Sequence, residues 1–267
     1  MNRNNRHTDN IGIFGKKEIR HIRKAAFSKK YELDADLAAF VDKNNREEYD
    51  FFSSPLIQTI YRYQIDYMLT FSNIWFKNRS VKILDWGCGR GHVSYWLKKF
   101  SKDVVSCDMI DNPVDEYMIK NDFGIDIILL KHNHKLPFED SCFDIVLSFG
   151  VLEHVQNDEL SLKELNRILK PDGLFFCFYL PYKLSYTQCF LGKGIHDRLY
   201  WKRTIKKLAK KANFEIMDIW HRALFPKRRF KLPFYQVIER IDNWLCNYSL
   251  LKYFATNIEF VAKKEIW

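Results

Sequence analysis

The residues best placed to do chemistry cluster in one glycine-rich stretch, residues 83–91, which reads ILDWGCGRG. A short apolar strand is expected over 81–84, and apolar side chains at helical spacing predict a helix over 92–100. A strand, a glycine turn and a helix together build the nucleotide pockets of α/β sheets. Glycines let the backbone approach a ligand closely, and the helix N-terminus adds unpaired N–H donors. The stretch therefore predicts a pocket for a nucleotide-like ligand.

Two common loops of this kind do not fit. A dinucleotide loop needs a further glycine where this chain has His92, and a phosphate loop needs Gly-Lys-Ser/Thr, which is absent. Instead, Asp85 precedes three glycines, and this pattern resembles the first motif of class I S-adenosylmethionine (SAM) methyltransferases. SAM has a zwitterionic methionine end and no phosphates, so an acid beside the loop is tolerated. On this stretch alone, an ordinary glycine-rich turn remains the alternative.

A second acidic residue ends the next expected strand, residues 104–108. Asp108 lies 23 residues after Asp85. A carboxylate at that distance can accept hydrogen bonds from both ribose hydroxyls of a nucleoside. Met109 follows directly and is expected to lie against the adenine. The two strand ends together would hold the nucleoside half of SAM.

Four further motifs follow in a fixed order, and with the glycine loop they cover about residues 80–220. They are Leu-Pro-Phe at 136–138, Phe-Asp-Ile-Val at 143–146, Leu-Glu-His at 152–154 and Leu-Lys-Pro-Asp-Gly at 169–173. The series resembles a large methyltransferase subfamily that includes quinone-biosynthesis, glycan and natural-product enzymes. In that family Leu-Glu-His starts a helix. The apolar run 125–130 fits a buried parallel strand that precedes these motifs.

The resemblance implies both a fold and a cofactor. The fold is an α/β, Rossmann-like class I methyltransferase sheet of seven strands, the last one antiparallel, with an N-terminal helical extension and a helical insertion before the last strand. The cofactor is S-adenosyl-L-methionine. The residues implied in its binding are Asp85, Gly87, Cys88, Gly89, Gly91, Asp108, Met109, Asn133, His134 and Phe149.

Two positions depart from the family pattern. His132 stands where the family usually has an acid that meets the adenine amino group, so Asn133 or a backbone group is expected to replace that contact. Gly150 stands where some quinone-pathway members have an additional acid. This second departure argues against a metal-assisted variant, and no metal site is predicted.

Length and composition fit one catalytic domain with additions. The chain has 267 residues, 47% hydrophobic and 28% charged, so it can bury a sizeable core and is not of the disordered class. None of its six cysteines forms a C-x-x-C pair, so free thiols in a reducing cytosol are expected. Residues 1–9 do not resemble a signal peptide, and no stretch approaches the roughly 20 apolar residues of a membrane span. We therefore expect a cytoplasmic protein.

Composition divides the chain into three regions. Residues 1–24 are basic and polar and are expected to be partly disordered, whereas residues 25–80 are predicted to form a helical cap. Residues 81–267 are expected to form the SAM-binding domain. Alternating apolar residues predict its sixth strand over 214–219 and its seventh over 257–261.

An insertion, about 221–255, separates these two strands and joins a basic cluster to an amphipathic segment. The cluster is KRRFK at 227–231, and the apolar residues that follow at helical spacing are Phe234, Val237, Ile238, Ile241 and Leu245, with Trp244 among them. Two interpretations remain open. A basic, aromatic, amphipathic helix can bind an anionic membrane, which predicts peripheral association through 227–245 at the inner membrane surface. Alternatively, the helix packs on its own domain.

Candidate catalytic residues follow the fourth and fifth strands. An oxygen acceptor must lose a proton, commonly to a histidine. His154 and His196 are the candidates, since both follow strands near the carboxyl edge where such sheets bind ligands. Arg198 is a candidate for pairing with an anionic group of the acceptor. A structural role is the alternative for His154, whose ring could cap or pack a helix.

The expected activity is SAM-dependent methylation of a small molecule or glycan, at oxygen. The C-terminal residues, such as 241–245 and 261–264, loosely resemble enzymes of bacterial surface-polysaccharide and lipid-linked sugar pathways. The formal net charge of +10 keeps an RNA methyltransferase as the main alternative. A non-catalytic subunit is disfavoured, because Asp85, the glycines and Asp108 are all present. The sequence leaves the oligomeric state undetermined.

Overall fold

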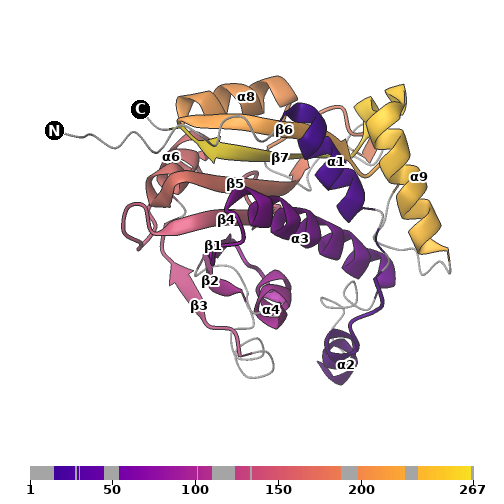
Figure 1. Ribbon diagram of the computed structural model, residues 1–267, viewed down its shortest axis with the longest axis horizontal. Coiled ribbons are helices and arrows are strands. Elements are labelled where there is room, and N and C mark those ends of the chain that lie inside the picture. Colours follow the sequence, from indigo (N-terminus) through magenta and orange to yellow (C-terminus); the bar gives the residue numbers. More distant parts are fainter. Residues whose placement is uncertain are drawn as a thin grey trace.

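A twisted seven-stranded sheet runs through the middle of the molecule (Figure 1). The computed structural model describes residues 15–27, 29, 31–44, 54–100, 102–109, 124–132, 134–187, 198–225 and 234–265. The strands are β1 (Lys82–Trp86), β2 (Asp103–Met109), β3 (Ile127–Leu130), β4 (Phe143–Phe149), β5 (Leu169–Pro181), β6 (Phe214–Arg222) and β7 (Asn257–Lys264). Their order is β3-β2-β1-β4-β5-β7-β6. Strand β7 pairs antiparallel with both β5 and β6, whereas the other strand pairs are parallel, which confirms the predicted sheet.

Helices cover both faces of the sheet and make a three-layer α/β fold. On one face, α1 (Lys16–Ala26), α3 (Pro55–Trp75) and α4 (His92–Lys99) share an apolar core with the strands. On the other face, α6 (Asp158–Ile168) and α8 (Lys202–Lys211) share a second core. The carboxyl ends of the parallel strands stay uncovered by these layers, and there the candidate site lies.

Three further elements lie at the periphery. Helix α2 (Ala35–Asn44) lies beside α4, since Lys99 of α4 pairs with Asp36 of α2 at 3.0 Å. Helix α9 (Tyr235–Tyr248) packs against β6 and α3 at the end of the sheet, and the 3₁₀ helix η2 (Leu250–Phe254) follows it (Figure 1). The described part of the chain contains no helix with the length and apolarity required to span a bilayer.

Burial explains why the central strands are mostly apolar. In β1, Ile83 points into the layer of α3 and α4, whereas Leu84 and Trp86 point into the layer of α6 and α8. A strand covered on both faces favours apolar residues at most positions, and the buried acids Asp85 of β1 and Asp144 of β4 accept hydrogen bonds. The run 125–130 was expected to be equally buried, and this is wrong, because β3 is the edge strand and Ile128 and Leu129 are 38% and 37% exposed.

Regular structure begins nearer the N-terminus than the sequence predicts. Helix α1 begins at Lys16, inside the region predicted to be partly disordered, because Ile19, Arg23 and Ala26 fall on one buried face. Arg23 is buried on this face, where its guanidinium forms an ion pair with the carboxylate of Asp218 at 3.3 Å. The basic cluster 227–231 lies outside the described residues.

The segment after β4 also differs from the prediction. The Leu-Glu-His motif at 152–154 forms a turn and does not start a helix. Helix α6 begins only at Asp158, where the side chain of Asn157 accepts a hydrogen bond from the N–H of Leu160 at 3.0 Å. Such an N-cap fixes the start of a helix. His154 therefore lies in a turn at the carboxyl edge of the sheet.

Candidate functional site

The glycine loop between β1 and α4 is held against the end of β2. The N–H groups of Gly87 and Cys88 both donate to the carbonyl of Cys107, at 2.9 and 3.0 Å. Gly91 ends the loop as the N-cap of α4, with a φ of 70°. The loop thus crosses the carboxyl edge of the sheet before the chain enters the helix, as predicted.

Two glycines of the loop are needed for different reasons. Gly87 has a φ of 70°, and a Cβ there would lie 2.4 Å from Cγ2 of Val151. The loop and the turn after β4 therefore approach too closely for a side chain. Gly89 has a φ of 53°, and a Cβ there would meet no atom within 4 Å. Gly89 therefore presents bare backbone to open space, which is the form of a ligand cradle.

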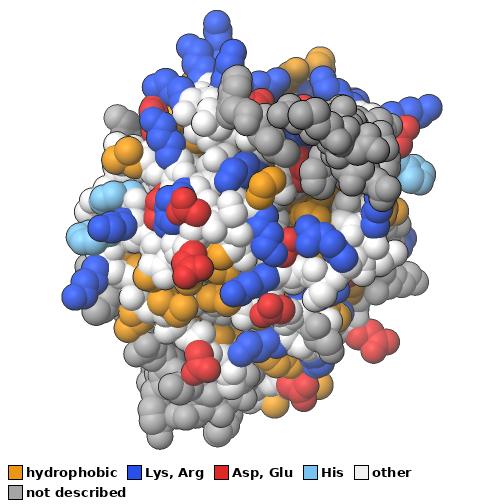
Figure 2. Space-filling view, turned by 60° about the vertical axis from the view of Figure 1, so that its left-hand side comes forward, with side chains coloured by type: hydrophobic (Ala, Val, Ile, Leu, Met, Phe, Trp, Pro, Cys, Tyr) orange, Lys and Arg blue, Asp and Glu red, His pale blue; other side chains and the backbone are white. Residues whose placement is uncertain are grey.

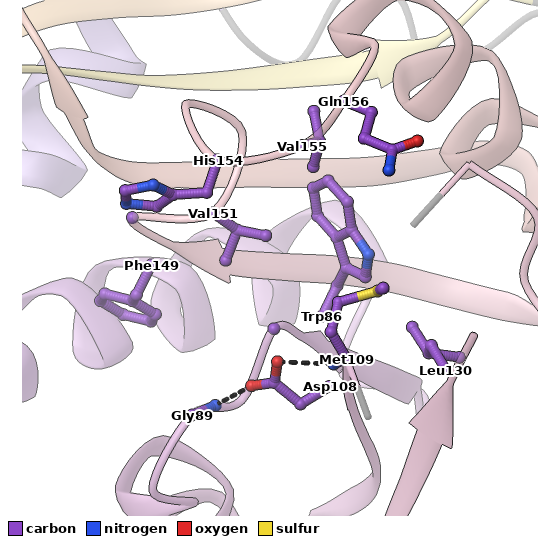
Figure 3. A pocket seen from close by; sticks show the side chains of 12 residues that line it. Trp86, Gly89, Asp108, Met109, Leu130, Phe149, Val151, His154, Val155 and Gln156 are labelled. Atoms are coloured by element: carbon purple, nitrogen blue, oxygen red, sulfur yellow. Dashed lines mark hydrogen bonds between the residues drawn. The ribbon is translucent and has the colours of Figure 1, made fainter. Parts of the chain in front are cut away.

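Asp108 joins the second strand end to this cradle. Its carboxylate accepts the N–H of Gly89 at 2.5 Å and the N–H of Met109 at 2.7 Å (Figure 3). A carboxylate has about four acceptor positions, so it can serve two ribose hydroxyls besides two backbone amides. The arrangement fixes Asp108 at the rim of the open space, as the ribose assignment requires.

Asp85 lies beneath the loop and does not face the ligand space. Side chains alternate along β1, so Asp85 points toward α4, where it accepts the hydroxyl of Ser94 at 2.6 Å. Ser94 lies 2.7 Å from Ser106 of β2. Burial raises the pKa of the Asp85 carboxyl to about 7. Asp85 thus ties β1, α4 and β2 together and does not line the cavity, and its predicted part in cofactor binding stays a prediction.

The open space is a cavity of about 530 Å³ at the carboxyl edge of the sheet (Figure 3). Small-molecule sites in proteins commonly have volumes of this order. Its walls come from the ends of β1 to β4 and from the turn after β4. The lining residues are Trp86, Gly87, Gly89, Asp108, Met109, Leu130, Phe149, Gly150, Val151, His154, Val155 and Gln156.

The structure brings together half of the predicted cofactor residues. Those that line the cavity are Gly87, Gly89, Asp108, Met109 and Phe149. Cys88 is 3% exposed and Gly91 caps α4, so both shape the loop from behind. His134 is not among the lining residues, and Asn133 lies outside the described residues. Leu130, at the end of β3, lines the cavity next to Met109 and was not predicted to do so.

Sequence reasoning missed part of the wall. Val155 and Gln156 were assigned to a helix, although Asn157-Asp158-Glu159 carries the signal of a helix start three residues later. Trp86 was counted only as part of the glycine motif. Its position as the last residue of β1 puts it at the strand end that borders the cavity.

Aromatic side chains form one side of the cavity and continue behind it. The ring of Phe149 lies 5.2 Å from that of Tyr61 on α3 and 6.0 Å from that of Tyr179 on β5. Tyr61 also meets the ring of His92 edge-on at 4.5 Å. Tyr179 has a φ of 62° and sits where the pairing of β5 with β7 shifts register. Such irregularities redirect side chains beside functional sites.

The predicted catalytic residues have different positions. His154 lines the cavity with its side chain 49% exposed, and its Nε2 lies 3.9 Å from Oε1 of the buried Glu153. Arg198 donates to the backbone carbonyls of Val155 and Gln156, the latter at 2.6 Å. Arg198 therefore supports the cavity wall, and its predicted pairing with an anionic group of the acceptor stays a prediction. His196 lies outside the described residues.

Comparison with known families identifies this arrangement. The family described as a methyltransferase domain matches residues 84–177, the segment that carries the glycine loop, Asp108 and the turn after β4. Residues 84–177 match a methyltransferase domain, and the sheet around them has the class I methyltransferase fold. SAM is the methyl donor of this family.

Solved structures share the fold of the methyltransferase domain. A SAM-dependent methyltransferase from Thermotoga maritima superimposes with a TM-score of 0.52 at 15% identity and covers 86% of this chain and 99% of its own. Another from Archaeoglobus fulgidus gives 0.50 at 20% identity, over 74% and 92% of the two chains. At these identities the likeness establishes the fold.

Curated relatives of the methyltransferase domain have more than one named activity. A mouse mitochondrial protein named arginine-hydroxylase NDUFAF5 is 33% identical over 95 residues, which are 34% of this chain and 26% of that protein. A ubiquinone biosynthesis O-methyltransferase of Pelagibacter ubique is 26% identical over 159 residues, 53% of this chain and 64% of that protein. The chain thus spans between a quarter and two thirds of these relatives.

Proposed function

We propose that this protein transfers the methyl group of SAM to an oxygen atom of a small, ring-bearing acceptor. One observation carries the proposal: a single cavity combines the Gly89–Asp108 cradle with the aromatic side chain of Phe149. The cradle suits a nucleoside, and the aromatic side suits a flat or apolar ring. Methyl transfer needs both to lie in one enclosed space.

The donor side is assigned to the ends of β1 and β2. Asp108 would accept the ribose hydroxyls, Met109 and Leu130 would flank the adenine, and the loop at Gly87 and Gly89 would hold the methionine portion. The bound cofactor supplies a methyl group already activated on a sulfonium. What the chain contributes is therefore placement of the two substrates and exclusion of water.

The acceptor side is assigned to Phe149 with Tyr61 and Tyr179 behind it. Aromatic side chains pack against planar rings and against the apolar faces of sugars. The relative from ubiquinone biosynthesis favours a phenolic ring. The loose C-terminal resemblance favours a sugar of a surface-polysaccharide or lipid-linked pathway. The shared chemistry is a ring hydroxyl presented beside an aromatic wall.

His154 is the proposed general base for an oxygen acceptor. It lines the cavity, and the buried carboxylate of Glu153 nearby would stabilise the imidazolium formed when the ring takes a proton. Arg198 would act as a positioning residue, since it holds the carbonyls next to His154.

RNA is the second candidate acceptor, because α8 carries six basic residues and no acid. Phosphates are held by continuous basic surfaces. On the face drawn in Figure 2, however, Lys and Arg alternate with Asp and Glu around apolar patches. This mixed surface favours a small acceptor.

A transfer assay with methyl-labelled SAM tests the proposal. Cell material separated into lipid, glycan, small-molecule and RNA fractions is incubated with the full chain, and label is expected in a non-RNA fraction. His154→Ala should lower turnover about 10²- to 10⁴-fold while SAM binding by calorimetry is kept. His21→Ala, at an exposed position of α1, is the matched control. Label in RNA would reject the small acceptor, and normal turnover of His154→Ala would reject the oxygen chemistry with a side-chain base.

A further inference from the structure

Helix α9 is attached to the protein through its charged residues. Glu239 and Asp242 are 0% exposed, and Cys246 on the same face is 3% exposed. Glu239 forms an ion pair with Arg222, the last residue of β6, whose side chain is 1% exposed. Asp242 accepts the backbone N–H groups of Leu224 at 2.7 Å and Phe225 at 3.2 Å. The acidic side of α9 is therefore its inner side.

The outer side of α9 is apolar. Val237, Ile241, Trp244 and Tyr248 are 50%, 49%, 58% and 57% exposed. At about 100° per residue they fall within an arc of roughly 60°. The following 3₁₀ helix continues this surface with large exposed side chains, namely Leu250, Leu251, Tyr253 and Phe254. More than half of the large exposed apolar residues in the described chain lie within 234–254. Soluble surfaces seldom concentrate apolar side chains in this way.

Basic side chains surround this apolar surface. Lys24 of α1 places its Nζ 4.7 Å from the ring centre of Tyr248, and Lys252 places its Nζ 5.3 Å from that of Tyr253. Arg240 is exposed on the flank of the apolar arc. Helix α1 adds the exposed Lys16, Lys17 and Arg20 against a single acid. Since the acids of α9 are buried, the charges that α9 and η2 expose are basic.

We propose that the outer surface of α9 and η2 docks onto an anionic lipid bilayer. Tryptophan and tyrosine favour the boundary between lipid and water, leucine and isoleucine enter the acyl region, and lysines and arginines meet the headgroups. Each basic residue near such a surface adds to the attraction. A second copy of the chain fits less well, because a two-fold contact would bring the two basic rims together.

Docking would orient the catalytic cavity relative to the lipid. Helix α9 packs on α3, and α3 carries Tyr61, whose ring contacts Phe149 in the cavity wall. An acceptor with a lipid tail could then stay in the bilayer while its head group enters the cavity. The docking itself needs neither SAM nor acceptor, so it can be measured independently of the proposed function.

Cosedimentation of the full chain with vesicles tests the docking. Vesicles of three parts phosphatidylcholine to one part phosphatidylglycerol should bind the protein, and pure phosphatidylcholine vesicles should bind it less. Trp244→Glu should weaken binding at least tenfold, whereas Leu160→Glu, at a residue 46% exposed on α6, should leave it unchanged. Lys252→Glu should weaken binding about fivefold or more. Unchanged thermal unfolding and SAM binding establish that each variant is folded.

Three results would overturn the docking. They are a wild-type chain that stays in solution with anionic vesicles at low salt, equal effects of Trp244→Glu and Leu160→Glu, and a dimer that Trp244→Glu converts to a monomer in light scattering. The last would assign the surface to a second copy. If Trp244→Glu does not fold, the Lys252→Glu variant decides on its own.

Discussion

The glycine loop has an acidic side chain beside its open cavity, whereas helix α9 points its acidic side chains into the protein. At the loop, the carboxylate of Asp108 lies at the rim of the cavity and backbone N–H groups converge on it. In α9, Glu239 and Asp242 point into the protein, and the apolar residues point outward. The side on which polar groups gather thus indicates what each surface contacts, a polar ligand at the loop and an apolar phase at α9. Changes in one region should leave the other's binding intact.

The largest expected effect is at the loop. Gly89→Leu adds a side chain that fills the cavity and requires a residue with a Cβ to keep a φ of 53°. No SAM binding should be measurable by calorimetry, while vesicle binding stays normal. Gly124→Leu is the matched control, because Gly124 also has a positive φ of 62° and open space around it but does not line the cavity. Normal SAM affinity in Gly89→Leu would remove the cofactor assignment.

The next largest effect is at the inner side of α9. Glu239→Gln leaves Arg222 buried without its carboxylate, which should lower the free energy of unfolding by about 3–5 kcal/mol in a urea titration. Glu215→Gln, which removes a 56% exposed partner of Lys263, should cost less than about 1 kcal/mol. Replacing both Arg222 and Glu239 by leucine should recover much of the loss. Equal costs for the two Gln variants would mean that α9 is not held by its charges.

The smallest effect concerns the ribose contact. Asp108→Ala removes a charged acceptor whose hydrogen bonds each contribute about 1.5–3 kcal/mol, so SAM affinity should fall at least about tenfold. Asp103→Ala, at the exposed start of the same strand, should leave the dissociation constant unchanged. An unchanged constant in Asp108→Ala would show that the carboxylate serves only to hold the N–H groups of Gly89 and Met109.

The sequence was sufficient for the sheet and the cradle because local patterns specify them. Gly87 and Gly89 occupy positive-φ positions that few other residues could fill, Asp108 lies at the end of a regular strand, and the antiparallel seventh strand follows from the family resemblance. The role of Asp85 was not predictable in the same way. Whether the Asp85 side chain faces the ligand or α4 depends on how side chains alternate along β1. The expected strand ends at residue 84, whereas β1 continues to Trp86 and therefore includes Asp85.

The orientation of α9 could not be read from the sequence either. Helical spacing identifies which residues share a face, and Val237, Ile241 and Trp244 do share one. Spacing does not say which face the protein covers. The buried face includes Glu239, which forms an ion pair with the buried Arg222 at the end of β6. The buried partner is distant in sequence, so no local pattern reports it.

The position of β7 has a consequence for how the chain is made. Strand β6 is joined to the rest of the described sheet through β7, which follows it in the chain. Until Asn257–Lys264 has emerged, β6 has no neighbour to pair with, and α9 is attached to a strand that is not yet in place. During synthesis the strands around the glycine loop are therefore available to pair before this edge can form. Until β7 is in place, Phe214 and Trp220 of β6 lack the burial that they have in the finished sheet, and exposed apolar side chains of this kind make partly folded chains prone to aggregate.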